Sequence, residues 1–122
     1  MADIRQAFLS AMKPRFKDVQ VPLIGTVKLR GVGSGEMREF KDSLTDDDGR
    51  RNERGKYVNE LLVALCVVDD TGARAWTDQD AMSGAFGEID SAAFAVLVRH
   101  CMEHTNFRAD VNWSDVETAA KN

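Results

Sequence analysis

The sequence predicts an α+β fold: a mostly helical single domain, residues 1–122, with an N-terminal β-hairpin. Three observations lead to this expectation. Most apolar side chains recur at intervals of three and four residues, as on one face of a helix. Residues 19–29 instead alternate apolar and polar side chains on either side of a glycine, as two paired strands do. The chain has 122 residues, 43% of them hydrophobic, which is enough for one modest core.

A short amphipathic helix is expected over residues 4–12, because apolar side chains recur at helical spacing until Pro14 stops the pattern. The β-hairpin follows, with Gly25 between its two alternating runs. Pro22 cannot donate a backbone hydrogen bond, which predicts that the first strand lies at a sheet edge. The apolar residues of the two runs are Val19, Val21, Leu23, Val27 and Leu29.

A second helix is expected after the hairpin, capped by Ser34. Met37, Phe40 and Leu44 lie on one stripe of this helix. Residues 45–56, "TDDDGRRNERGK", contain no apolar side chain, so burial cannot offset the entropy lost on ordering them. This segment is therefore expected to be a mobile loop.

The segment from Tyr57 carries the broadest apolar stripe and predicts the principal helix of the core. A turn at residues 69–72 and a short extended arm at residues 73–76 are expected next. Thr77, with Asp80 three residues later, has the spacing of a helix N-terminus. The sequence thus predicts another helix after the arm.

The last long helix is expected to begin at Asp90 or Ser91 and to present one apolar face to the core. That face consists of Phe94, Leu97, Val98, Cys101 and Met102. Residues 107–122 are expected to form a frayed tail. Within it, Ser114 and Glu117 have the spacing of a capping box.

Composition and charge restrict the function. With 16 basic and 20 acidic residues, the chain offers no basic surface for nucleic acid. Its longest apolar run, residues 61–68, is far shorter than the roughly 20 residues of a membrane helix, and its first residues lack the apolar stretch of a secretory signal. Cys66 and Cys101 lie among apolar residues, as buried free thiols do. We expect a cytosolic protein that binds neither nucleic acid nor membrane.

The triplet Asp70-Thr71-Gly72 is the short signature of an aspartic protease. Such an enzyme needs two carboxylates about 3 Å apart, so a chain of this length would have to dimerise. The helices expected around the triplet also differ from the all-β barrel of retroviral-type proteases. A turn is the favoured interpretation, in which Asp69 or Asp70 accepts backbone hydrogen bonds and Gly72 has a positive φ. A dimeric aspartic protease stays as the remote alternative.

Three further motifs suggest ligand sites, but simpler interpretations are favoured. "HCMEH", residues 100–104, matches the zinc motif H-x-x-E-H, yet histidines are also favourable at the C-terminal end of a helix. "GVGSGE", residues 31–36, resembles a dinucleotide loop, but Glu36 replaces the third glycine and would repel a pyrophosphate. "DDDG" does not align with a calcium loop. We therefore assign no catalytic, cofactor-binding or metal-binding residue.

Trp76, Phe107 and Trp113 are the candidate partner-binding residues, because each is an aromatic residue that looks exposed. Aromatic side chains dominate the energetics of many interfaces, although a single tryptophan in a small domain often belongs to the core. Since no enzymatic centre emerges from the residues, protein binding is the expected activity.

The order of elements over residues 19–107 resembles that of tail assembly chaperones of long-tailed bacteriophages. "VQVPLIGTVKLRGVGSGEMREF" is similar to the hairpin and the G-E-x-x-x-F helix start of that family. Residues 57–107 are similar to its second half, in which a helix leads into a V-x-D-x-x-G turn, an aromatic residue, a T-D-x-D helix start and a final long helix. Trp76 stands where the family usually has phenylalanine.

This resemblance implies a non-enzymatic protein without cofactors, made by a phage or prophage in the host cytoplasm and not expected in the mature virion. It would coat the tape measure protein, keep that helical client soluble, help to recruit the tail tube protein, and self-associate. The alternative is another small phage morphogenesis protein or a head-tail adaptor, which would stay in the particle. The family is often also made in a longer, frameshifted form, and Ala120-Lys121-Asn122 permits a slippery codon run that sequencing the gene would test.

Overall fold

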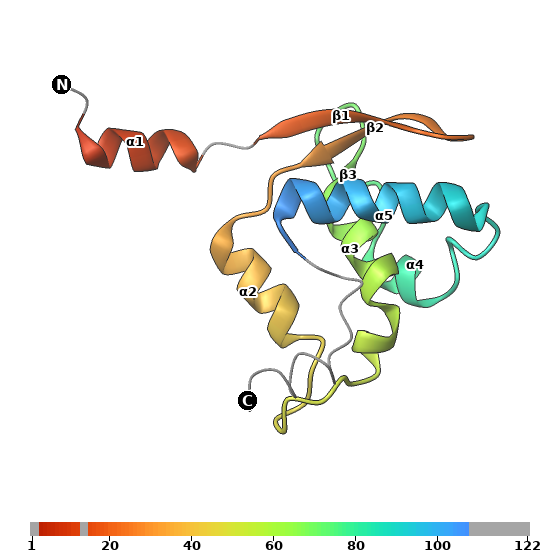
Figure 1. Cartoon of the computed structure of the whole chain (residues 1–122). Helices are drawn as coiled ribbons and strands as arrows, with labels where there is room; N and C mark the ends of the chain where they lie inside the picture. The colour runs from red at the N-terminus through yellow and green to blue at the C-terminus, as the bar shows by residue number, and fades with distance from the viewer. Residues whose placement is uncertain (1–2, 13–14, 108–122) are drawn as a thin grey trace, which may run out of the picture.

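The computed structural model describes residues 3–12 and 15–107, and in these residues the expected α+β fold is confirmed (Figure 1). Five α-helices accompany a three-stranded antiparallel sheet that begins with the hairpin. The elements are α1 (Ile4–Ala11), β1 (Phe16–Val21), β2 (Gly25–Arg30), α2 (Ser34–Asp42), the 3-10 turn η1 (Arg54–Tyr57), α3 (Val58–Cys66), β3 (Val67–Val68), α4 (Asp78–Met82) and α5 (Ser91–Thr105). The expected frayed tail lies, apart from Phe107, outside the described residues.

The sheet has the order β1-β2-β3, so β1 lies at an edge, as Pro22 predicted. Val19 of β1 faces Val27 of β2, and both side chains point into the core. The expectation that Leu23 continues the first strand is wrong. The chain turns after β1, where Leu23 has φ 69° and is 85% exposed at the hairpin tip.

Helix α3 forms the centre of the core, as its broad apolar stripe predicted. Seven of its nine residues are buried, and Leu61, Leu62 and Val63 are fully so. Helices α4 and α5 pack against it, and β3 continues from its C-terminus into the sheet. The sheet and the two later helices are thus held together by one apolar helix, around which the chain folds (Figure 1).

The helix starts follow the expected capping residues, with one correction. Thr77 and Asp80 form the predicted capping box of α4, and the Asp90 carboxylate accepts the backbone N–H of Ala93 at the start of α5. Ser34 was expected to cap α2, but it is the first helical residue and Gly33 is the cap. Gly33 has extended backbone angles, and without a side chain it adds no capping hydrogen bond.

Residues 45–56 contain several hydrogen bonds that close the segment on itself. The Asp46 carboxylate accepts backbone N–H groups of Asp48 and Arg50, each at 3.0 Å. The Asn52 side-chain amide donates to the backbone carbonyl of Ser43 at 2.9 Å. These contacts define one closed conformation of the segment. Its mobility stays a prediction, which a substitution at a buried glycine can test.

Cys66 and Cys101 are buried free cysteines, as expected. A hydrogen bond with Cys66, together with burial, raises the pKa of the Cys101 thiol. The pair joins α3 to α5 in the core, and a thiol with a raised pKa is a poor nucleophile. Within the described residues, no helix has both the length and the apolar character needed to cross a lipid bilayer.

Candidate functional site

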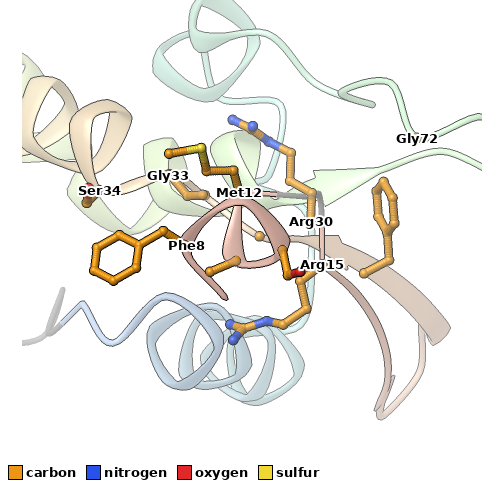
Figure 2. A pocket seen from close by; sticks show the side chains of 12 residues that line it. Phe8, Met12, Arg15, Arg30, Gly33, Ser34 and Gly72 are labelled. Carbon is orange, nitrogen blue, oxygen red and sulfur yellow. The ribbon is translucent and has the colours of Figure 1, made fainter. Parts of the chain in front are cut away.

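The candidate site is an open groove of about 1000 Å³ between α1 and the body of the domain. We call it the N-terminal groove. Its principal lining residues are Phe8, Met12, Arg15, Phe16, Arg30 and Val32. Figure 2 shows Phe8 and Met12 on the helix, and the guanidinium groups of Arg15 and Arg30 extending in opposite directions. The groove thus combines apolar side chains with two cations.

One wall of the groove is α1, which projects from the body in Figure 1. Asp3 caps the N-terminus of the helix, where its carboxylate accepts the N–H of Arg5, and every residue of the helix is exposed. Phe8 is 63% and Met12 74% exposed. A helix of eight residues is not stable in water by itself, and its stability normally comes from packing an apolar face. The exposed face of α1 is therefore suited to contact with another molecule.

The opposite wall brings together residues that are distant in the sequence. Phe16 begins β1, and its ring lies against Gly72, where an added Cβ would be 3.4 Å from Cζ of the ring. Gly31 follows β2 and lies even closer to Arg15, since an added Cβ there would be 3.2 Å from the Arg15 Cβ. Small residues on this wall let the backbone approach the aromatic and arginine side chains closely.

Both arginines of the groove are held by the body. Arg30 donates through Nε to the Leu65 carbonyl at 2.8 Å and through its two terminal nitrogens to the Glu36 carboxylate at 3.0 and 2.7 Å. This hydrogen-bonded ion pair lowers the pKa of Glu36. Arg15 donates to the backbone carbonyl of His104 at 2.6 Å. The cations are thus fixed in position, whereas the apolar side chains of α1 are exposed.

The protease-like triplet lies in a tight turn, as the favoured interpretation of the sequence predicted. The Asp69 carboxylate organises it by accepting the N–H of Thr71 at 2.9 Å, the Thr71 hydroxyl at 2.6 Å and the N–H of Ala73 at 3.2 Å. These hydrogen bonds, led by that from the hydroxyl, lower the pKa of Asp69. Gly72 has the expected positive φ, 88°. The turn contributes to the N-terminal groove through Gly72 and not through a carboxylate.

The zinc-like motif places its two histidines in different surroundings. His104 is only 9% exposed, and its Nε2 has no hydrogen-bond partner within the described part of the chain. His100 is partly exposed. Among the described residues, no three His, Cys, Asp or Glu side chains are grouped so that they could hold a metal ion.

His104 is expected to make stability depend on pH. Burial lowers its pKa below 6.5, as do the positive charges of Arg15 and Lys17. The unfolded chain then binds a proton more readily than the folded chain, so the stabilisation from His104 is complete above pH 6.5 and is lost as pH falls below it. Urea denaturation between pH 7.5 and 5 should show a falling free energy of unfolding. His104→Gln should flatten this slope and His100→Gln should keep it; equal slopes in all three proteins would contradict the assignment.

The three predicted partner-binding aromatic residues differ in their exposure to solvent. Trp76 is 39% exposed, with its ring edge-on to Phe86 at 5.3 Å between centroids. Phe107 was expected to look outward, but this is wrong: it is 3% exposed and packs on Phe40 in the core. Trp113 lies outside the described residues. The exposed Phe8 was not recognised as a candidate, although its helical spacing already marked an apolar face.

Comparisons with protein-family models, with curated proteins and with solved structures found no match for this chain.

Proposed function

We propose that this protein is a phage tail assembly chaperone. It binds the tape measure protein in the host cytoplasm, assists tail tube assembly, and leaves before the virion matures. It performs no enzymatic reaction in this role. The resemblance in element order supports this proposal, and the single structural observation that carries it is the exposed apolar face of α1 beside the N-terminal groove.

An apolar or amphipathic helix is the ligand that this groove fits best. Its side chains would contact Phe8 and Met12 on one wall and Phe16 on the other. Burying an exposed phenylalanine or methionine is worth about 1.5–3 kcal/mol, so a few contacts give binding that is useful but reversible. Methionine adapts to ligands of different shape, which suits a client that presents many non-identical helical turns.

The proposal is tested by co-expressing this protein with the tape measure gene of the same phage. The wild-type protein should bring the client into the soluble fraction as a complex with several copies per client. Phe8→Glu should lower the amount of soluble client at least tenfold, because it places a charge in the apolar wall. Gln6→Glu, with the same charge change at another exposed position of α1, should keep the complex.

Two outcomes would contradict parts of this proposal. If Phe8→Glu and Gln6→Glu retain equal amounts of soluble client, the N-terminal groove is not the binding site. If the wild-type protein leaves the client insoluble, the chaperone assignment is wrong. A head-tail adaptor would then be expected in purified particles, where mass spectrometry would detect it.

A further inference from the structure

A second apolar groove lies at the end of the domain away from α1, where α4 and the first turns of α5 meet α3 (Figure 1). We call it the helical groove. It encloses about 260 Å³, which is less than the roughly 300–1,000 Å³ of a pocket for a drug-sized ligand. The groove therefore suits one or two anchoring side chains of a partner protein better than a whole small molecule. Its apolar lining residues are Tyr57, Ala81, Phe86, Ile89 and Phe94.

Three aromatic side chains line the helical groove, and Trp76 continues their surface outward. The rings of Phe86 and Phe94 lie 5.7 Å apart between centroids, and the ring of Trp76 is edge-on to Phe86 at 5.3 Å. Phe86 is buried, whereas Trp76 beside it is 39% exposed. Aromatic rings attract lysine and arginine side chains over their faces as well as apolar groups. Trp76 can thus contact both parts of a ligand that carries an apolar side chain next to a cation.

The chain around the helical groove is acidic. Residues 75–98 contain four acidic side chains and no lysine or arginine, and every lining residue except Tyr57 and Glu60 lies in this stretch. Two of the acidic residues, Glu88 and Asp90, are exposed and alternate along the chain with lining residues. Glu60 itself lines the groove. Three carboxylates are thus placed in or beside one apolar surface.

The basic side chains of the neighbouring elements form ion pairs with other carboxylates. These pairs are Lys56 with Glu53 at 2.9 Å, Arg54 with Asp78 at 3.2 Å and Arg74 with Asp78 at 2.7 Å. Within the described ranges, no ion pair involves Glu60, Glu88 or Asp90. The Asp90 carboxylate caps α5, but a carboxylate has room for further hydrogen bonds. The rim of the groove therefore offers negative charge to a ligand.

We propose that the helical groove binds a basic segment of a partner protein. One bulky apolar side chain of that segment enters the groove, and a neighbouring lysine or arginine contacts the carboxylates and the ring of Trp76. A basic segment fits better than an acidic or a purely apolar one, because only a basic segment compensates the three carboxylates as it covers the apolar lining. The surface is separate from the N-terminal groove, so the inference does not rest on the proposed client.

The contact is expected to be weak and to depend on salt. A groove that takes one or two side chains gives less contact area than the roughly 1,200 Å² of a small stable interface. A dissociation constant between roughly 1 μM and 1 mM is therefore expected. Because part of the attraction is between exposed charges, about 0.5 M salt should weaken it.

Fluorescence anisotropy with two labelled peptides tests the charge preference. Both peptides have about 12 residues with leucines at helical spacing, and the other positions are lysine in the basic peptide and glutamate in the acidic peptide. The basic peptide should bind the wild-type protein about tenfold more tightly than the acidic peptide. Equal binding of the two peptides would overturn the inference. The net charge of −4 also favours a basic peptide, so matched variants are needed to locate its site.

The first pair of variants tests the position of the site. Ser91→Arg places a bulky cation in the groove lining at an exposed helix start, so it should weaken binding of the basic peptide about tenfold. Ala92→Arg makes the same charge change at the next exposed residue, which is not a lining residue, and should bind the basic peptide nearly as well as the wild type. Circular dichroism checks that both variants are folded. Equal weakening by the two variants would overturn the assignment to the helical groove.

The second pair tests the role of the carboxylates. Glu60→Gln removes one charge from the groove lining with little change of shape and should weaken binding of the basic peptide several-fold. Glu103→Gln removes the same charge from an exposed position near the far end of α5 and should leave binding unchanged. The difference between the two variants should disappear in about 0.5 M salt. If Glu60→Gln binds the basic peptide as tightly as Glu103→Gln at low salt, the proposed basic partner is wrong.

Discussion

Replacing Gly55 with alanine is expected to lower the free energy of unfolding by about 2–3 kcal/mol, because the new methyl group has no room. Gly55 is buried in η1, and an added Cβ would overlap the carbonyl oxygen of Leu44 and the side chain of Arg51. The Leu44 carbonyl cannot move freely, since it accepts the N–H of Asn52 at 3.0 Å. Accommodating the methyl group would therefore require breaking the hydrogen bonds that close residues 45–56.

Urea denaturation followed by circular dichroism measures this effect, with Gly35→Ala as the matched control. Gly35 is exposed within α2 and has open space around it, so alanine there should raise stability by about 0.5–1 kcal/mol through its better helix propensity. If Gly55→Ala left stability unchanged, residues 45–56 would not hold the closed conformation, and the mobile loop expected from their composition would be correct.

Features that depend on neighbouring residues could be predicted from the sequence. Thr77 and Asp80 satisfy each other's backbone groups within one helical turn, so their spacing was sufficient evidence for a helix start. The turn at Asp69 and Gly72 is local in the same way. The predicted cap of α2, Ser34, is wrong by one residue. Gly33 can also adopt the extended backbone angles of a helix cap, and the local sequence pattern does not distinguish the two positions.

The candidate site depends on contacts that the sequence pattern cannot reveal. Arg15 binds a carbonyl 89 residues later in the chain, and Phe16 packs on a glycine of the protease-like turn. The spacing of apolar residues in α1 predicted the helix and its face correctly, but periodicity does not say what covers that face. Phe107 differs from α1 in that it looked exposed in the sequence but is buried. Only the packing of the chain after α5 against the core reveals this.

Leu61→Ala and Leu9→Ala should separate stability from binding of the client, because they delete the same atoms at two very different positions. Leu61 is fully buried in α3, and truncating it should lower the free energy of unfolding by about 3 kcal/mol, a large fraction of the stability of a domain of this size. Leu9 is 47% exposed on α1, and its truncation should change stability by no more than about 0.5 kcal/mol.

Binding of the client should show the reverse order. At a temperature where both variants are folded, Leu9→Ala should lower the amount of soluble client several-fold, since it removes exposed apolar surface from α1, whereas Leu61→Ala should hold the client in solution as the wild type does. Urea denaturation and co-expression with the client measure the two quantities. If Leu9→Ala instead lost stability as Leu61→Ala does, α1 would pack on its own domain, and its apolar face would belong to the core rather than to a binding surface.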